Sequence, residues 1–586
     1  MTGLGVLGDV RPADTFDQET VLLARPGSEA PSTLATSGRQ PSTPDHGELI
    51  KQAASFALDR AKRAADDNPT STTVAALAQS YAALEERDNA IQAAHRAIEL
   101  AMGAEGRDGA VFDAISLRLA AEVLLRFGER LAAYAAIRRA PRTRPLRIMF
   151  ASLASEEGDA ELALAELDGM TDPLAEALRG YVLASIEKYQ EAIGHLRAAL
   201  REQPDDPDSL LNLSISLWRL GARRKAIATA LRATRVAPGR KDVSLHYMNL
   251  LLEQGETDAV DAEVRSLKSH HVVEGSDLLI IQARSLIERR QLERAIPLLR
   301  SAAEAAGAEG DDANRAEVLG NLVALRYETR RITHNEALQR LEKLLEEFAN
   351  FESVVLQYAR FARTADRAPR LKAAVEVVEG QTSPLRRAYL RYQVAYLEGD
   401  NEAAAKAASE WFALEPGNSM AAASALVALG IGVERWKDAS LVAREALKLF
   451  PYDPAIVNNA AYVLAMSGES EEAIELLKPI AGDDFAMNAT LGLAHLAAGR
   501  INEGMRLYRN AADTAERVDP DWRSLMTAYQ ALVVRQLGIL RSHPAGAIGA
   551  LALAQFDPPK DWRNRPEFLR LWTVAKRNGY EWPLAL

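Results

Sequence analysis

The sequence predicts an all-α chain in which pairs of helices stack into an open array. The length of 586 residues fits either three or four ordinary domains or one long repetitive array. The composition, 48% hydrophobic but only 6% aromatic and rich in alanine, favours helices that pack through small side chains. The same residue types also recur 34 positions apart, as Pro204 with Pro238 and Gly221 with Gly255. Together these observations favour the repetitive array.

The first segment, residues 1–47, is expected to be a flexible N-terminal arm. It is rich in Gly, Pro, Ser and Thr and has no sustained helical or alternating period. No Lys or Arg precedes Asp9, and the early apolar run from Val21 to Ala24 is far shorter than the core of a signal peptide. Farther on, the apolar stretch Met420 to Val433 is shorter than the roughly 20 residues that span a bilayer. We therefore expect a cytoplasmic protein without membrane insertion.

The repeating unit begins after this arm and consists of a helix, a turn at Gly, a second helix and a Pro that ends it. One unit shows all four parts in Leu213 to Leu217, Gly221, Ala226 to Ala233, and Pro238. About twelve such units are expected between residues 48 and 515. The sequence divides into an N-terminal array at 48–310, degenerate central repeats at 311–384, a C-terminal array at 385–515 and a C-terminal helical cap at 516–586.

Small and large apolar residues keep the same phase from unit to unit. They include Leu77, Ala78, Tyr81, Ala90, Ala94 and Ala97 in an early unit, Gly180, Leu183, Ala192, Leu196, Ala199 and Pro204 in a middle unit, and Leu426, Ala439, Ala443, Ala446 and Pro451 in a late unit. In this pattern the chain resembles tetratricopeptide repeat (TPR) proteins. The resemblance implies an α-solenoid, a right-handed superhelix whose concave groove is lined by the first helix of each pair.

The central units depart from the common length. The unit with Leu319 and Gly320 reaches Ala337 only after extra residues at 329–335, and the next unit, with Tyr358, is also stretched. A kink in the solenoid or an inserted recognition loop would explain the extra residues, and the kink is the favoured explanation.

The C-terminal segment, residues 516–586, lacks the repeat phase. Helices are expected at Asp521–Leu537 and Ala545–Gln555, followed by a stop at Pro558. The aromatic candidates for a cap or a docking face are Trp562, Phe568, Trp572 and Trp582. A cap is the first expectation, because a solenoid must cover its exposed apolar end.

Catalytic and metal-binding patterns are missing from the sequence. The absence of cysteine excludes disulfides, thiolate zinc sites and a cysteine nucleophile. No phosphate-binding loop, nucleophile elbow, His-Glu-x-x-His helix or calcium loop is present. A net charge of -11 also disfavours a general nucleic-acid surface. We expect no enzymatic activity, no catalytic residues, no metal and no cofactor.

The resemblance to TPR proteins suggests which side chains face the groove. The candidates are Tyr181, Asn212, Trp218, Arg219, His246, Asn249, Arg386, Tyr389, Gln393, Tyr396, Asn458, Asn459 and Tyr462. Aromatic, Asn and Arg side chains suit peptide recognition, although about half of these are expected to serve packing alone. The Lys and Asn clamp by which some TPR proteins hold a chaperone tail is absent around Asn212, so recognition of such a tail is disfavoured.

A basic connector is the candidate anion contact. Its members are Arg138, Arg139, Arg142, Arg144 and Arg147. These guanidinium groups could hold a phosphorylated or acidic partner, and nucleic-acid binding here is a minor alternative. The favoured explanation is a solvated loop balanced by Glu156 and Glu157.

The leading functional hypothesis is a non-enzymatic scaffold that binds a peptide or protein partner in the groove or at the C-terminal end. The alternative is a regulatory sensor subunit whose superhelix controls a separate effector enzyme, with the central units as its hinge. An enzyme with a divergent site is a third class, which no motif supports. The identity of the partner and the oligomeric state stay open.

Overall fold

The computed structural model describes residues 46–103, 112–272, 274–518, 520–539 and 562–578. These residues form helices and turns, with no strand among them. They fall into two compact units, an N-terminal unit (46–274) and a C-terminal unit (275–578). Most of the arm expected at 1–47, the helix expected at Ala545–Gln555 and Trp582 lie outside the described residues.

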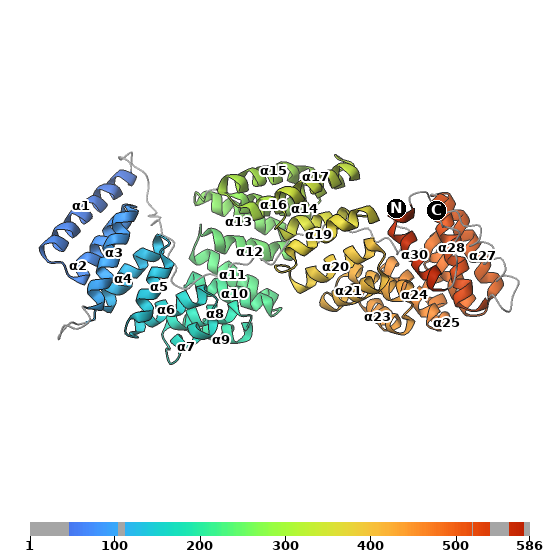
Figure 1. Cartoon of the computed structure of the whole chain (residues 1–586), viewed down its shortest axis with the longest axis horizontal. Coiled ribbons are helices and arrows are strands. Elements are labelled where there is room, and N and C mark those ends of the chain that lie inside the picture. The colour runs from blue at the N-terminus through green and yellow to red at the C-terminus, as the bar shows by residue number, and fades with distance from the viewer. Residues whose placement is uncertain (1–45, 104–111, 273, 519, 540–561, 579–586) are drawn as a thin grey trace. The chain divides into compact units, whose positions relative to one another are not determined.

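The N-terminal unit consists of successive helices joined by short turns (Figure 1). Its helices are α1 (His46–Asp67), α2 (Ser71–Ala83), α3 (Arg87–Met102), α4 (Ala114–Arg126), α5 (Arg130–Arg139), α6 (Arg144–Glu156), α7 (Ala160–Leu167), α8 (Pro173–Ser185), α9 (Tyr189–Glu202), α10 (Pro207–Arg219), α11 (Arg223–Val236), α12 (Lys241–Glu253) and α13 (Thr257–Ser269).

The C-terminal unit continues the same alternation and includes three short helical segments. Its elements are α14 (Ser276–Glu288), α15 (Leu292–Glu309), α16 (Asp312–Glu328), α17 (His334–Glu347), α18 (Glu352–Phe361), the 3₁₀-helix η2 (Ala365–Arg367), α19 (Ala368–Val378), α20 (Pro384–Glu398), α21 (Asn401–Leu414), α22 (Ser419–Leu426), the π-helix η3 (Val427–Gly432), α23 (Trp436–Leu449), α24 (Pro454–Met466), α25 (Ser470–Leu477), α26 (Phe485–Ala497), α27 (Ile501–Glu516), α28 (Pro520–Gln536), the 3₁₀-helix η5 (Trp562–Asn564) and α30 (Pro566–Arg577).

Aspartates begin many of these helices. The Asp206 carboxylate accepts a hydrogen bond from the backbone N–H of Ser209 at 2.9 Å, and Pro207 occupies the first turn of α10. Asp311 caps α16 in the same way through the N–H of Asn314 at 3.0 Å. These carboxylates satisfy amide groups that have no partner inside the helix. The acidic residues in the turns therefore have a structural role.

The turn within most pairs contains one residue in the left-handed backbone region. Gly221 (φ +74°) and Gly255 (φ +74°) occupy this position, as the spacing predicted. In other pairs the position holds a residue with a side chain, such as Glu187 (φ 64°) or Arg330 (φ 57°). Glycine adopts this conformation without the steric cost that a Cβ brings. The repeat is consequently more regular in its backbone than in its sequence.

Small residues lie where the helices of a pair cross. A Cβ atom added to Gly180 of α8 would lie 2.5 Å from Cγ of Leu196 on α9. At Gly492 of α26 it would lie 2.9 Å from the carbonyl oxygen of Gly504 on α27. Such distances require the backbones to approach closely, which only small residues permit. The recurring spacing of Gly and Ala along the sequence thus sets how closely the helices pack.

Within each unit, first helices lie side by side. Helix α8 contacts α6 and α10, and α24 contacts α22 and α26, whereas adjacent second helices lack comparable contacts among the described residues. In a curved stack the row with closer neighbours is the inner row, so the first helices line the concave side. The predicted all-α solenoid of TPR-like helix pairs is confirmed, and α28 packs against α26 and α27. A capping role for the C-terminal segment stays a prediction.

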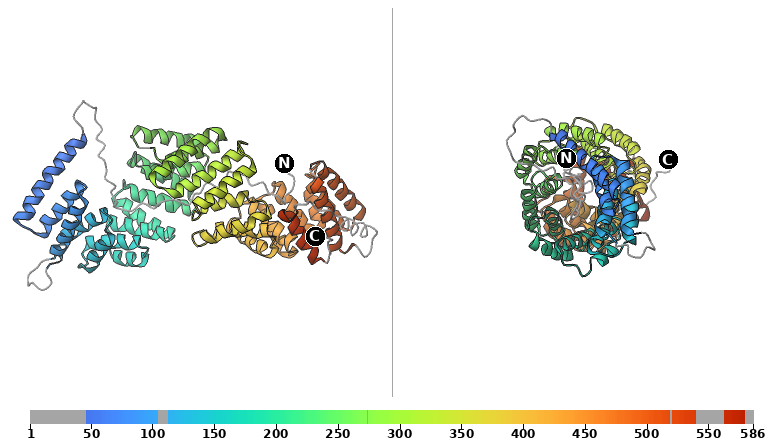
Figure 2. Two further views of the ribbon diagram at one scale, coloured as in Figure 1. Left: turned by 45° about the horizontal axis from the view of Figure 1, so that its top comes forward. Right: turned by 90° about the vertical axis from the view of Figure 1, so that its left-hand side faces the viewer.

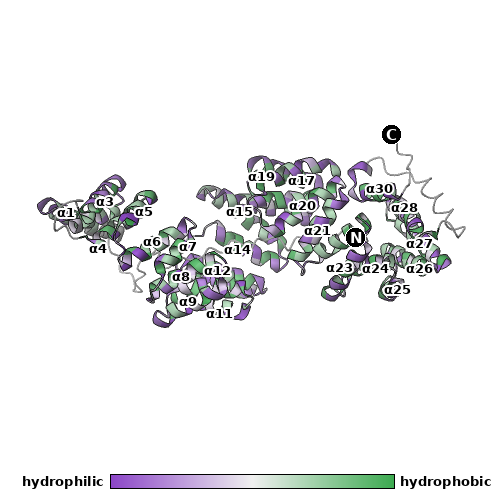
Figure 3. Ribbon diagram, turned by 60° about the horizontal axis from the view of Figure 1, so that its bottom comes forward, coloured by the Kyte–Doolittle hydropathy of each residue, from purple (hydrophilic) through white to green (hydrophobic). Residues whose placement is uncertain are grey.

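Most helices show apolar residues on one side and polar residues on the other (Figure 3). That distribution is expected when each helix buries one stripe against its neighbours. Among the described helices, none combines the length and the apolar character needed to cross a bilayer.

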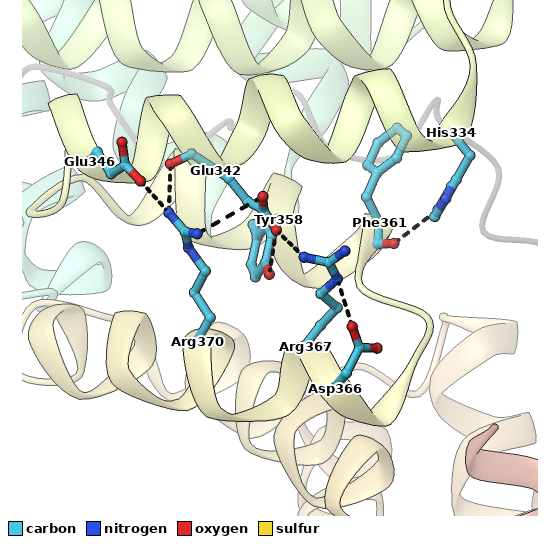
Figure 4. A network of polar contacts seen from close by, with 8 residues as sticks. All are labelled: His334, Glu342, Glu346, Tyr358, Phe361, Asp366, Arg367 and Arg370. Atoms are coloured by element: carbon cyan, nitrogen blue, oxygen red, sulfur yellow. Dashed lines mark hydrogen bonds and ion pairs between the residues drawn. The ribbon is translucent and has the colours of Figure 1, made fainter. Parts of the chain in front are cut away.

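The stretched central pairs contain no long insertion. Residues 329–333 form a short turn before α17, and η2 bridges α18 and α19. The carboxylate of Glu342 on α17 accepts a hydrogen bond from Arg367 at 2.6 Å, while Arg370 donates to Glu346 at 2.6 Å (Figure 4). Tyr358 also points its hydroxyl at Glu342, and burial together with this carboxylate raises the pKa of Tyr358 to about 12. These contacts hold α18, η2 and α19 against α17.

Candidate interaction surfaces

In the N-terminal unit, the candidate groove residues differ in how accessible they are. Asn212 and His246 are buried, Tyr181, Trp218 and Asn249 are half-buried, and Arg219 is exposed. The guanidinium of Arg223 lies 5.5 Å from the Trp218 ring and partly covers it. The side chains that a partner could touch directly are therefore the half-buried and exposed ones, and their role in binding stays a prediction.

His246 makes a buried polar contact between α12 and α10. Its Nε2 lies 2.9 Å from Oγ of Ser214, whose hydroxyl donates to the carbonyl oxygen of Ala226 at 2.8 Å. Because that hydroxyl has only one proton, Nε2–H of His246 must be the donor to Ser214. Nδ1 has no hydrogen-bond partner among the described residues, and burial lowers the pKa of His246 to about 4. His246 is thus a neutral packing residue at physiological pH.

In the C-terminal unit, the candidates on α20 form a partly buried row. Arg386 pairs with Glu352 of α18 at 2.6 Å. The Tyr389 ring meets Trp411 edge-on at 5.0 Å, and burial raises the pKa of Tyr389 to about 12. Gln393 and Tyr396 are half-buried and continue the row toward the C-terminal end of α20.

The candidates on α24 are more deeply enclosed. Asn458, Asn459 and Tyr462 are 5%, 3% and 8% exposed, respectively. The Tyr462 ring packs 6.2 Å from that of Trp436, and burial raises the pKa of Tyr462 well above its usual value. In this structure these three residues contribute to packing. A partner could contact them only if the side chains and helices that cover them moved aside.

The arginine connector is largely paired within the N-terminal unit. Arg142 and Arg147 lie 3.4 and 3.6 Å from the carboxylate of Glu166, and Arg144 lies 3.0 Å from Asp172. Arg138 and Arg139 are exposed in the last turn of α5. The carboxylates that balance the connector are thus Glu166 and Asp172, whereas Glu156 pairs with Arg130. An anion would compete with these pairs, so the proposed anion contact stays a prediction.

A contact that sequence reasoning did not foresee lies within the C-terminal unit. Helix α30, remote in sequence, packs against α20, η3 and α28. Figures 1 and 2 show it (dark red) next to the red helices that include α28. Phe568, Leu571 and Val574 of α30 are buried at helical spacing. We call the surface beneath it the α30 face. Its residues are Tyr396 of α20, Ile431 of η3, Glu434, Tyr462 of α24 and Tyr529 of α28, of which Ile431, Tyr462 and Tyr529 share one buried cluster with the apolar stripe of α30.

A buried arginine is the most unusual feature of this contact. The guanidinium of Arg570, which is 4% exposed, lies 5.1 Å from the centre of the Tyr396 ring, and Tyr396 stacks on Tyr392 at 6.0 Å. Burial alone would lower the pKa of Arg570, but its phenolic neighbours and Glu567 raise it, and the net shift is upward. Nη1 of Arg570 and the Tyr529 hydroxyl have no hydrogen-bond partner among the described residues. The ring face of Tyr396 is therefore one of the groups that stabilise this charge, together with Glu567.

Ion pairs and hydrogen bonds hold both ends of α30. At its start, Arg565 contacts Asp521 of α28 at 2.7 Å and Glu567 at 2.8 Å. At its end, Asn578 donates to Glu434 at 2.9 Å, and Arg577 donates to the carbonyl oxygen of Gly432 at 3.3 Å. Glu434 lies two residues after the π-helix η3 and has a left-handed backbone (φ 60°). The carboxylate of Glu434 thereby points toward α30. Short π-helical turns are frequent at functional sites.

The candidate cap residues that the structure describes all belong to the α30 contact or adjoin it. Phe568 is fully buried against the α30 face, and Trp562 and Trp572 are half-buried with ring centres 5.6 Å apart. The apolar stripe of α30 was a signal available in the sequence, but the sequence offered no sign of which helices it would meet. Nothing in the described residues groups three or more His, Asp or Glu side chains as a metal site.

Known proteins resemble this chain in structure only at low sequence identity. No family model matches the chain, and no curated protein matches it in sequence. Among solved structures, the chain is similar to the Cut9-Hcn1 hetero-tetramer of the APC/C (14% identity, 82% of this chain and 94% of that one, TM-score 0.46). A tetratricopeptide repeat protein from Parabacteroides merdae has 17% identity (42% and 97% covered, TM-score 0.33), and human IFIT1, solved as a dimer with m7Gppp-AAAA, has 14% identity (69% and 91% covered, TM-score 0.35).

Proposed function

We propose that this protein is a non-enzymatic scaffold that holds a peptide or protein partner on the concave side of its helix pairs. The observation that carries the proposal is the seating of α30. A helix that is not part of the stacked pairs packs against α20, η3 and α28 and buries an apolar stripe there. A surface that accepts one helix in this way has the shape and chemistry of helix-in-groove recognition.

The rest of the concave side also supports this function. Half-buried Trp218 and Asn249 in one unit, and Tyr389 and Gln393 in the other, present aromatic and amide groups from first helices. Aromatic side chains supply rigid contact area, and amides can bond a backbone, so both types are frequent at protein interfaces. The proposal needs no reaction, metal or cofactor.

A regulatory subunit that controls a separate effector enzyme would use the same concave surface. The two functions differ in the partner: a scaffold joins proteins into a complex, whereas a sensor binds one enzyme and changes its activity. Identification of the captured protein, followed by an activity assay of that protein with and without this chain, separates the two.

The test is photo-crosslinking of the full chain from defined positions. A photoreactive phenylalanine analogue replaces Asn249 or Gln393 on first helices, and in matched controls it replaces the exposed Leu131 of α5 or Leu441 of α23. We expect the same partner to be captured from Asn249 or Gln393 and at least tenfold less of it from Leu131 or Leu441. Capture that is equal at all four positions, or stronger from the second helices, would refute concave binding.

A further inference from the structure

The polar contact between Arg570 of α30 and Tyr396 of the α30 face suits selective recognition better than stabilisation of the fold. Burying a charged group is costly, and apolar side chains of similar volume often stabilise a fold as well or better. Arg570 nevertheless lies buried against Tyr396 with one nitrogen lacking a hydrogen-bond partner among the described residues. What such a group provides is selectivity, because only a side chain with a cation and a flat shape fits the tyrosine faces.

Helix α30 itself is short and amphipathic. It has 12 residues, and isolated helices of that length are only marginally stable in water. Its helical form therefore depends on the α30 face, which supplies an apolar floor with a carboxylate, Asp521 or Glu434, at each end. Another amphipathic helix with the same pattern would meet the same groups.

Resting on the scaffold function proposed above, we propose that the α30 face is the docking site for an amphipathic helix of a partner protein, and that α30 is its internal competitor. The partner helix places an arginine on Tyr396 in the position of Arg570. It has an aromatic residue two positions before that arginine, as Phe568 is, and apolar residues one and four positions after it, as Leu571 and Val574 are. Release of α30 and docking of the partner are then mutually exclusive.

A reversible covalent lock on α30 tests the competition in the full chain. A Cβ atom at Gly399, the residue that follows α20, would lie 3.3 Å from Cβ of Leu569 on α30. This is a few tenths of an ångström from the separation of about 3.8 Å usual in disulfides. Because the natural sequence has no cysteine, Gly399→Cys with Leu569→Cys introduces the only two thiols. Comparing the oxidised and reduced forms of one molecule cancels any strain from Cys at the left-handed position 399.

The probe is a fluorescent synthetic peptide of residues 562–578. We expect it to bind the reduced double variant at least tenfold more tightly than the oxidised one. A peptide with Arg570→Ala should bind at least tenfold more weakly, whereas Lys576→Ala, which removes the same charge from an exposed site, should bind within about twofold of the unchanged peptide. In the chain, Tyr396→Leu should abolish the preference for Arg570, and Tyr396→Phe, which keeps the ring face, should preserve it.

A tightly seated α30 could mask binding, so a second variant opens the site. Leu571→Asp in the full chain puts a carboxylate in the apolar stripe and should raise peptide affinity at least tenfold over wild type. If this variant keeps its helical circular dichroism but binds no peptide, or if oxidised and reduced chains bind the peptide with the same measurable affinity, the proposal is overturned. Capture of a partner from Asn249 in the oxidised chain would then show that the scaffold function holds without docking at the α30 face.

Discussion

At the scale of single residues, His246 shows how the fold converts a candidate binding side chain into an interior one. The sequence offered a polar, aromatic ring at a groove-facing position, but the structure places it at 5% exposure with one hydrogen bond to Ser214. Its neutral form is favoured because a second proton on Nδ1 would create a buried charge without a hydrogen-bond partner. The pKa of about 4 follows from that burial.

This depressed pKa predicts a pH-dependent stability of the N-terminal unit. The unfolded chain takes up a proton at His246 near pH 6.5, whereas the folded chain does not until about pH 4. The contribution of His246 to the free energy of unfolding should therefore be constant above about pH 7 and fall as the pH drops from 6.5 to 4. Between pH 7 and pH 5 the loss at this site is about 2 kcal/mol.

Urea unfolding followed by Trp218, the one tryptophan between residues 17 and 274, measures this loss. The signal of interest is the part of the fluorescence change that Trp218→Phe removes. His246→Gln should reduce the difference between pH 7 and pH 5 by about 2 kcal/mol, and His95→Gln at an exposed site of α3 should leave it unchanged. An unchanged pH difference in His246→Gln would mean that the ring is not enclosed as described.

At the scale of the helix pair, the turn conformation matters more than the residue that adopts it. Gly221 has φ +74°, and a Cβ there would touch no atom within 4 Å. Gly221→Ala should therefore destabilise the N-terminal unit by about 1–2 kcal/mol through backbone strain alone. Gly194, within helix α9, also has open space around it, and Gly194→Ala should stabilise by up to about 1 kcal/mol. Urea midpoints that move in the same direction for both would contradict this assignment of the turn.

The same comparison explains how far the sequence could predict the elements. Gly221, Gly255 and the prolines marked many boundaries, because these residues have backbone preferences that are visible without a structure. The central pair that turns at Arg330 carried no such mark, since a residue other than glycine can be held in the left-handed region by the packing around it. Registers were therefore clear in regular pairs and obscure in the central ones.

The α30 contact was beyond sequence reasoning for a related reason. Phe568 and Tyr396 were each singled out as candidates, but the contact between α30 and α20 joins segments more than a hundred residues apart. Periodicity reports which face of a helix is apolar and is silent on which distant helix will cover it. The buried Arg570 gave no signal at all, because an arginine at that position of an amphipathic helix is ordinarily solvent-exposed.

At the scale of the whole molecule, a stack of helix pairs should respond to damage locally. Each pair packs mainly on its neighbours, so stability is approximately a sum of pair and nearest-neighbour contributions. Gly180→Ala would force a Cβ to within 3.2 Å of the Leu196 backbone nitrogen and should cost about 1–3 kcal/mol. Gly492→Ala, against the Gly504 carbonyl oxygen and the Tyr508 backbone nitrogen, should cost a similar amount in the other unit.

Hydrogen exchange of the full chain distinguishes local from global loss. Gly180→Ala should speed exchange in α8, α9 and the adjoining pairs while α26 and α27 keep wild-type rates, and Gly492→Ala should give the reciprocal result. The two variants are matched controls for each other, because the substitution is the same and in both the new Cβ lies 3.2 Å from a backbone nitrogen of the facing helix. Faster exchange throughout both units in either variant would mean that the chain unfolds as one cooperative body. In that case a partner bound to one unit would also stabilise the other unit. If the units unfold independently, a partner would stabilise only the unit to which it binds.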